Sequence, residues 1–222
     1  MAHKHKTFTM ADLTRNFQVV LPDTSVIYSS DTFRFSPTIP PKLRLNHKRR
    51  ELAFLRKMQQ AYVRYPNILI IPEVLGEIAQ PEIRGFEEAR REYQSEGKDL
   101  SVKLLETTKE QISRKSHFVR ICSECPRHQM TEHEAQVYEE FNRAYSEWMD
   151  DLELKPTGRR VFLLGATFYL TRGSCAVLTN NSAIRKLGKL LRDTQNIPRQ
   201  TFAVLKRVGE DEYVFPTKSL KP

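Results

Sequence analysis

The fold is indicated most clearly by Phe17-Gln-Val-Val-Leu-Pro-Asp-Thr-Ser-Val-Ile-Tyr28. Its apolar run, Val19 to Leu21, predicts a strand buried on both faces of a parallel sheet, because such strands are short and continuously hydrophobic. The run ends at Asp23, and ligand chemistry in open α/β sheets collects beyond the carboxyl ends of the strands. A carboxylate there, followed by two hydroxyl side chains, suits a hard cation such as Mg²⁺ or Mn²⁺. The alternative is that Asp23 is an ordinary N-cap that begins a helix.

The composition indicates a globular protein with a basic surface. The 222 residues are 39% hydrophobic and 28% charged, which allows a sizeable core. The formal net charge of +9 favours a polyanionic partner, because Lys and Arg release counterions when they contact phosphates. No apolar run approaches the length of a membrane span, the first residues lack a hydrophobic signal region, and three cysteines do not suggest a disulfide framework. We therefore expect a cytoplasmic protein with no membrane partner.

Another strand and two helices are predicted next along the chain. Residues 43–65 have apolar side chains at helical spacing with basic side chains between them, which predicts an amphipathic helix with a basic outer face. Residues 67–72 predict a second buried strand, and a helix with Glu73 and Glu77 on one face begins after it. This alternation predicts βαβ units and a parallel sheet. The apolar positions of the first helix are Leu45, Leu52, Leu55, Met58 and Tyr62, and its basic ones are Arg44, Lys48, Arg49, Arg50, Arg56, Lys57 and Arg64.

The middle of the chain predicts further helices rather than a separate module. Its segments are rich in charge, poor in β-branched residues and not isolated by a Gly/Ser linker. We therefore interpret residues 78–150 as a helical insertion within one domain that spans residues 1–222. The expected helices cover residues 82–94, 99–117 and 131–149.

The last third of the chain returns to the α/β pattern, whereas residues 1–16 are polar and predict an irregular lead-in. The boundaries of the elements expected here are indicated by apolar runs, by Gly173 and by basic side chains. The expected elements are a helix over 161–170, a buried strand over 175–178, a basic helix over 183–191 and two terminal strands over 201–205 and 212–215.

Two of these segments resemble the motifs of a known family. Leu21-Pro-Asp23-Thr-Ser-Val-Ile and Ile70-Ile-Pro-Glu73-Val-Leu-Gly-Glu77-Ile resemble the first two signatures of PIN-domain nucleases. The resemblance implies an α/β fold, a three-layer α/β/α sandwich with a central, mainly parallel sheet. It also implies that carboxylates cluster at the strand ends, bind divalent metal and cut RNA. By this resemblance Asp23 is the first family acid and Glu77 is the second.

The later family motifs are altered in this chain. The apolar helix resembles a segment that an Asp opens in the family, but residues 157–160 read Thr-Gly-Arg-Arg and contain no acid. The turn Thr179-Asn180-Asn181 resembles the family's Thr-Asn-Asp turn, with Asn181 where an Asp is usual. Asp23 and Glu77 alone can hold one ion, because Mg²⁺ often takes one or two carboxylates and keeps its waters.

Two more side chains are candidate metal ligands. Asn181 offers a neutral amide oxygen, which supplies no charge for a second ion. Asp151, with Asp150 and Glu153, lies just before the apolar helix and could replace the missing acid, since loops often carry catalytic groups. The expected metal ligands are therefore Asp23, Glu77, Asn181 and Asp151, of which the first two are the expected catalytic residues.

Polar side chains beside these acids are candidates for contacts with RNA. Arg160 could contact the scissile phosphate, and the alternative is an ordinary surface charge. Basic residues on the helices over 43–65 and 183–192 could hold the strand. The expected RNA-binding residues are Thr24, Ser25, Arg160, Thr179, Asn180, Arg185 and Lys186.

A second candidate metal site lies in the helical middle. Cys122 and Cys125 have zinc-ligand spacing, and His128 and His133 follow them. All four lie in one short segment, whereas zinc sites usually separate their ligand pairs by a longer stretch. The alternative is two structural cysteines beside surface histidines.

The sequence thus leads to a hypothesis with two rivals. The leading hypothesis is a PIN-like endoribonuclease, a hydrolase that uses Mg²⁺ or Mn²⁺ at an incomplete acidic site. The first rival is a catalytically inactive PIN-like protein that binds RNA or acts in an assembly, with a homo-oligomer or a protein partner. The second is a toxin-like ribonuclease that needs a protein inhibitor.

Overall fold

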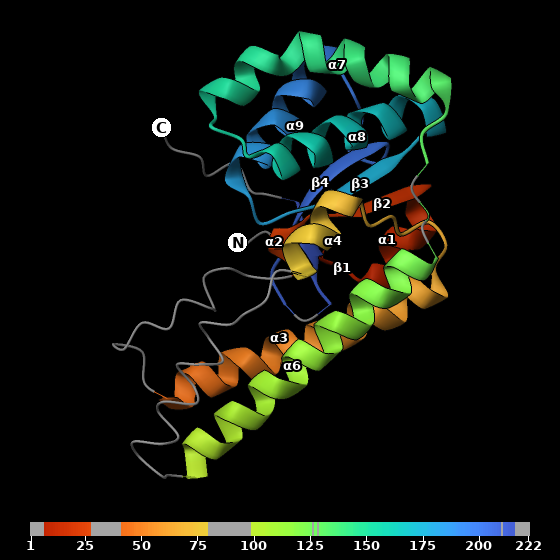
Figure 1. The fold of residues 1–222 in the computed structure, drawn as a ribbon. Helices are drawn as coiled ribbons and strands as arrows, with labels where there is room; N and C mark the ends of the chain where they lie inside the picture. Colours follow the sequence, from red (N-terminus) through yellow and green to blue (C-terminus); the bar gives the residue numbers. More distant parts are fainter. Residues whose placement is uncertain are drawn as a thin grey trace.

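The computed structural model describes residues 7–27, 41–79, 99–125, 127, 129–209 and 211–215. Helices lie on both sides of a central sheet, so the chain has an α/β fold, as predicted (Figure 1). The strands are β1 (Thr7–Phe8), β2 (Val19–Pro22), β3 (Cys175–Leu178), β4 (Phe202–Arg207) and β5 (Tyr213–Val214). The helices are α1 (Met10–Asn16), α2 (Thr24–Ile27), α3 (Pro41–Arg64), α4 (Pro72–Ala79), α6 (Asp99–Glu124), α7 (Glu132–Asp151), α8 (Pro156–Arg172) and α9 (Ser182–Gln195).

In the described part of the chain the sheet has the strand order β1-β5-β4-β3-β2. β2, β3 and β4 are parallel, with Val19 opposite Cys175 and Cys175 opposite Phe202, whereas β5 and β1 add an antiparallel edge. All four residues of β2 and of β3 are buried, which confirms the two strands predicted from continuous apolar runs.

The segment predicted as a strand over residues 67–72 makes only a short parallel contact with β2. The Val20 N–H donates to the Asn67 carbonyl at 2.9 Å, and the Leu69 N–H donates to the Val20 carbonyl at 2.9 Å. Val20 and Ile68 form an isolated bridge. The prediction is therefore correct in burial and direction but not in extent, because Pro72 begins α4 directly afterwards.

The predicted irregular lead-in is wrong for residues 7–16, which form β1 and α1. Thr9 caps α1: its hydroxyl accepts from the Asp12 N–H, and the Asp12 carboxylate accepts from the Thr9 N–H. This reciprocal arrangement is a capping box. Met10 and Leu13 lie on the buried face of the helix, three residues apart. The signal was present as a hydroxyl residue and an acid at capping-box spacing.

α8 and α9 pack on one face of the sheet, and α7 packs outside α8. α1, α2 and α4 lie on the other side, where the long pair α3 and α6 extends past the sheet (Figure 1). One hydrophobic core includes residues of the sheet, of α6 and of α7. The helix expected over residues 82–94 lies outside the described residues. Within those residues, no helix is long and apolar enough to cross a membrane.

α3 and α6 run in the same direction. Gln111 of α6 donates to Glu51 of α3 at 3.0 Å, and further along both helices the Tyr62 hydroxyl donates to the Cys125 carbonyl at 2.8 Å. The predicted apolar positions of α3 are all buried. Its basic face needs one correction: Lys48 is 2% exposed, and its ammonium donates to Gln111 at 3.2 Å.

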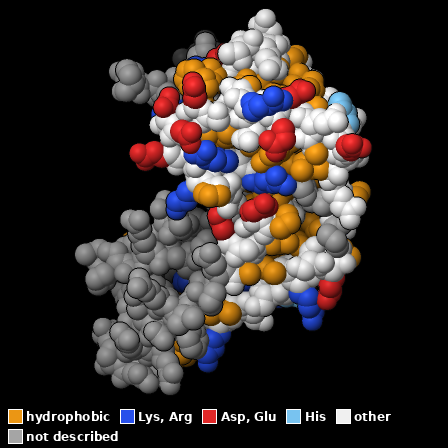
Figure 2. Space-filling model, turned by 45° about the horizontal axis from the view of Figure 1, so that its top comes forward, with side chains coloured by type: hydrophobic (Ala, Val, Ile, Leu, Met, Phe, Trp, Pro, Cys, Tyr) orange, Lys and Arg blue, Asp and Glu red, His pale blue; other side chains and the backbone are white. Residues whose placement is uncertain are grey.

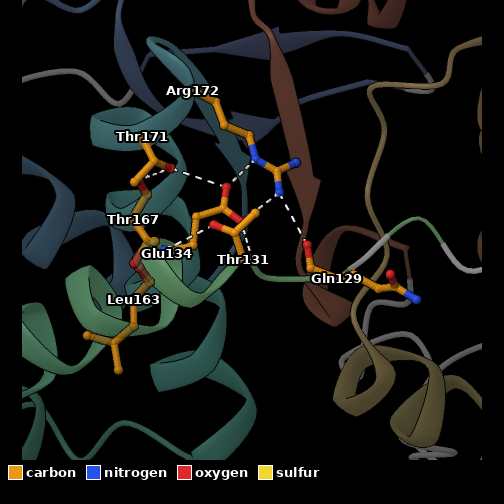
Figure 3. A network of polar contacts seen from close by, with 7 residues as sticks. All are labelled: Gln129, Thr131, Glu134, Leu163, Thr167, Thr171 and Arg172. Carbon is orange, nitrogen blue, oxygen red and sulfur yellow. Dashed lines mark hydrogen bonds and ion pairs between the residues drawn. The ribbon is translucent and has the colours of Figure 1, made fainter.

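A polar network joins the start of α7 to the end of α8 (Figure 3). The buried Glu134 carboxylate accepts from Arg172 at 2.6 and 3.1 Å and from the Thr131 N–H at 2.9 Å. Thr171 donates to the same carboxylate at 3.3 Å. The hydrogen bond from Arg172 is the main reason that the pKa of Glu134 is lowered to about 2.

Candidate functional site at the ends of β2 and β3

Asp23 lies at the carboxyl end of β2, where its backbone and its side chain have different roles. Its N–H donates to the Leu178 carbonyl of β3 at 2.8 Å, and its carbonyl accepts from the Val26 N–H at 3.0 Å as α2 begins. One carboxylate oxygen, Oδ2, accepts from Ser25 Oγ at 2.5 Å and from Thr179 Oγ1 at 2.8 Å. Asp23 therefore lies directly before α2, and its carboxylate is buried.

Burial is the main cause that raises the pKa of Asp23, which is only 5% exposed. Hydrogen bonds from Ser25 and Thr179 act in the opposite direction, and the negative charge of Glu77 raises the pKa further. Asp23 and Glu77, which are 54 positions apart in the sequence, thus lie close enough to repel each other. Glu77 is half-buried on α4.

The turn after β3 is fastened to the start of α2. The Asn180 N–H donates to Ser25 Oγ at 2.9 Å, and Asn180 Nδ2 donates to the Ser25 carbonyl at 2.9 Å. The Arg185 guanidinium, from α9, donates to the Asn180 carbonyl at 2.6 Å. Ser25, Thr179 and Arg185, predicted to bind RNA, therefore hold the protein's own turn and acid in place.

Asn181 is occupied as the N-cap of α9. Its Oδ1 accepts from the Ala183 N–H at 2.9 Å, and its own N–H donates to Thr179 Oγ1 at 2.9 Å. Within the described part of the chain, Asn180 Oδ1 and Thr24 Oγ1 are buried and make no hydrogen bond. Asn180 Oδ1 is therefore free of the internal hydrogen bond that occupies Asn181 Oδ1.

Arg160 lies beside α4, the helix that carries Glu73 and Glu77. Its Nε is 3.6 Å from Glu73 Oε1, and its guanidinium lies 4.7 Å from the centre of the Tyr138 ring. Arg160 Nε is buried and has no hydrogen-bond partner among the described residues. Lys186 is exposed on α9. The contact with Tyr138 joins side chains distant in sequence, so no local pattern could have indicated it.

Asp151 is exposed at the end of α7, and Asp150 forms an ion pair with Arg159. Across the ranges that the structure describes, no three His, Cys, Asp or Glu side chains are grouped to hold a metal ion. Asp151 therefore does not complete a three-acid cluster with Asp23 and Glu77.

The candidate zinc ligands are not gathered together in the described part of the chain. Cys122 is buried and Cys125 is exposed, whereas His133 is exposed on α7. Burial raises the pKa of Cys122 to about 12, which opposes formation of the thiolate that binds zinc. His128 lies outside the described residues.

Sequence reasoning also missed Arg207, which ends β4. Its guanidinium donates to the Val26 carbonyl at 2.6 Å and lies 3.9 Å from the centre of the Phe54 ring. It thereby joins α2, next to Asp23, to α3. The pairing crosses most of the chain, and no motif signals it.

Comparisons with known proteins assign no family. A scan against protein-family models gives no match, and searches of the curated proteins and of the solved structures give none. The PIN-like interpretation therefore depends on the sequence motifs.

Proposed function

We propose that Asp23 and Glu77 bind one divalent cation, Mg²⁺ or Mn²⁺, and that the chain is a PIN-like ribonuclease with an incomplete acidic site. The proposal rests on two acids: Asp23 is buried at the carboxyl end of β2, and the negative charge of Glu77, on α4, raises the pKa of Asp23. A bound cation relieves such repulsion and favours the ionised form of both acids.

The donor set suits a hard cation. Asp23 supplies a buried carboxylate and Glu77 a second one. Asn180 Oδ1 and Thr24 Oγ1 are buried oxygens with no partner among the described residues. Carboxylate, amide and hydroxyl oxygens are the ligands that Mg²⁺ and Mn²⁺ prefer.

The residues around the acids then have distinct tasks. A bound divalent ion supplies an activated water and stabilises charge on the leaving oxygen. Ser25 and Thr179 orient the Asp23 carboxylate through hydrogen bonds at 2.5 and 2.8 Å. Arg160 and Lys186 provide positive charge for the RNA phosphates.

A second candidate function is an RNA-binding protein without catalysis. Arg160 favours it, because a fixed cation beside Glu73 opposes the gathering of further metal charge at this edge. The absence of a three-acid cluster from the described residues points the same way. The two candidates share the RNA contact and differ in cleavage.

Mn²⁺ binding and RNA cleavage by the full chain separate the two. The nuclease proposal expects that Mn²⁺ raises the melting temperature of the wild type, and that a labelled single-stranded RNA is cut only with the metal. Asp23→Asn should abolish both effects, whereas Glu147→Gln, which removes an exposed carboxylate from α7, should abolish neither. RNA binding without any cleavage in Mn²⁺ would support the second candidate. A wild type that neither binds nor cleaves RNA would overturn both candidates.

A further inference from the structure

Two arginines donate to main-chain carbonyls of the segments that contact the Asp23 carboxylate. Arg207, at the end of β4, donates to the Val26 carbonyl of α2 at 2.6 Å. Arg185, on α9, donates to the Asn180 carbonyl in the turn after β3, also at 2.6 Å. The two guanidinium groups come from different elements, and each fixes one of the two backbone segments that meet at Asp23.

α2 depends on outside contacts because it is a single helical turn, and the first turn of a helix is unfavourable to form. The Val26 N–H donates to the Asp23 carbonyl at 3.0 Å, and the Val26 carbonyl accepts from Arg207. Arg207 is itself fixed, because its guanidinium lies 3.9 Å from the centre of the Phe54 ring. Burial lowers the pKa of Arg207, and the charge of Glu51, on α3, acts in the opposite direction. Arg207 therefore ties the turn that follows Asp23 to β4 and α3.

The turn after β3 reaches Asp23 through Ser25. The Asn180 N–H donates to Ser25 Oγ at 2.9 Å, and Asn180 Nδ2 donates to the Ser25 carbonyl at 2.9 Å. Ser25 Oγ in turn donates to Asp23 Oδ2 at 2.5 Å. The position of Ser25 thus depends on Arg207 through α2 and on Arg185 through Asn180.

We propose that Arg185 and Arg207 are positioning residues, which keep the Asp23 carboxylate oriented for a divalent cation. This inference rests on the cation binding by Asp23 and Glu77 proposed above. Partners that orient a metal ligand commonly change metal affinity about 10- to 100-fold when they are removed. Loss of a nearby positive charge would by itself strengthen cation binding. Weaker binding after removal of either arginine therefore has the sign that positioning requires and that charge alone opposes.

Titration of the full chain with Mn²⁺, without RNA, tests the proposal through the electron paramagnetic resonance signal of the free ion. Arg207→Gln and Arg185→Gln should each weaken Mn²⁺ binding at least about tenfold. Arg207→Lys should recover most of the loss, because a single N–H group makes the contact. Arg199→Gln is the matched control: Arg199 also lies over a phenylalanine ring, but it is exposed and, among the described residues, bonds to neither segment. It should bind Mn²⁺ as the wild type does.

Amide hydrogen exchange of the metal-free protein separates positioning from a general loss of stability. The Val26 amide should exchange faster in Arg207→Gln, and the Asn180 amide should exchange faster in Arg185→Gln. The buried Cys175, whose N–H is hydrogen-bonded at the start of β3, is the reference and should keep its rate. Equal acceleration at Cys175 would mean that the variants destabilise the whole fold, which would overturn the assignment.

The two measurements also distinguish this inference from the proposed function. If the wild type binds Mn²⁺ and both glutamine variants bind it equally well, the positioning role is overturned while the cation site stands. If the wild type binds no Mn²⁺, the proposed cation site and the positioning role toward it are both overturned. If Arg207→Gln does not fold, Arg185→Gln and Arg207→Lys still give the comparison.

Discussion

At the scale of single residues, Asp23 has one role through its backbone and another through its carboxylate. Its backbone joins β2 to α2, while its carboxylate is buried against Thr179 and the charge of Glu77 raises its pKa. Such a group destabilises the protein when it is ionised, because its pKa is raised by folding. The destabilisation is present at neutral pH and disappears as the pH falls through the raised pKa.

Asp23→Asn should therefore stabilise the metal-free protein at neutral pH. An amide keeps an oxygen that can accept from Ser25 and Thr179 but carries no charge to bury. We expect a gain on the order of 1 kcal/mol, or roughly 2–4 °C in melting temperature. Differential scanning calorimetry in a chelator at pH 7 and pH 4 would check it. The gain should shrink at pH 4, and a lower melting temperature of the variant at pH 7 would contradict the argument.

Glu134 makes the opposite prediction, because folding lowers its pKa to about 2 from 4.5. Its ionised form stabilises the protein at neutral pH, and that stability is lost as the pH falls from about 5 toward 2. Glu134→Gln should cost about 1–3 kcal/mol at pH 7, because it removes charge-assisted hydrogen bonds from Arg172. Urea unfolding from pH 7 to pH 2.5 would measure this.

The control for that experiment is Glu139→Gln, which removes an exposed carboxylate from the same helix. It should leave stability within about 0.5 kcal/mol of the wild type. The wild type and Glu134→Gln should converge at the acid end. An unchanged difference across the whole pH range would contradict the role given to the ionised carboxylate.

At the scale of elements, two helices approach the sheet through glycines. A Cβ on Gly165 of α8 would lie 2.4 Å from Val177 Cγ2, and one on Gly188 of α9 would lie 2.2 Å from Val204 Cγ2. Both distances are far below van der Waals contact. The close packing of α8 and α9 on β3 and β4 therefore depends on the absence of a side chain at these positions.

Gly188→Ala should destabilise the protein by about 1–3 kcal/mol, because the added methyl group overpacks the contact with Val204. Gly76→Ala, in α4, is the matched control: nothing lies within 4 Å of the added Cβ. That substitution should stabilise by up to about 1 kcal/mol through helix propensity. Chemical denaturation of both variants gives the comparison. Equal stability of the two would contradict the packing argument.

The sequence was informative where one residue pattern has one physical meaning. Fully buried strands need continuous apolar runs, so β2 and β3 were predicted at residues 19–21 and 175–178, and the predicted apolar face of α3 is buried. The sequence was misleading at Lys48. A basic residue on the basic face of a helix gives no local sign that it will be buried and contact Gln111 of α6.

For the candidate site, the sequence could predict where residues lie relative to the strands and helices, but not the contacts of their side chains. The pairing of Asp23 with Glu77 came from the resemblance to the PIN-domain motifs, and Asp23 lies, as expected, just beyond the carboxyl end of β2. The partners of each side chain could not be predicted, since Ser25, Thr179 and Asn180 turned inward to hold Asp23 and each other. Those contacts depend on the register of β2 against β3, which a single sequence does not specify.

At the scale of the whole molecule, charge is distributed unequally between the outer helices. In the described residues, every exposed charged side chain of α3 is basic, and its one acid, Glu51, is buried. The exposed charges of α7 are mostly acidic. The face of the molecule turned forward in Figure 2 mixes acidic, basic and hydrophobic side chains. A polyanion such as RNA should therefore contact α3 rather than α7.

Charge reversal on α3 tests this directly. The double variant Arg49→Glu, Arg50→Glu should weaken RNA binding at least about tenfold in 50 mM salt and reduce the slope of log affinity against log salt by about 2. Arg143→Glu combined with Lys155→Glu changes the net charge equally at exposed positions of α7 and just before α8. RNA affinity is measured by filter binding over a salt series. The control double variant should lose only the part of the affinity that both double variants lose through their equal change in net charge. Equal losses would mean that overall charge, rather than α3, governs binding.

The pairing of Thr7 with Val214 makes the first and the last described strands neighbours in the sheet. The start of β1 and the end of β5 therefore lie side by side, and a peptide could join Thr7 directly to Val214 in place of the residues outside them. New termini could then be opened at the exposed Glu153, between α7 and α8, where the backbone already has a positive φ of 49°. Such a circular permutant keeps every strand neighbour and every helix intact while reversing which half of the molecule is synthesised first.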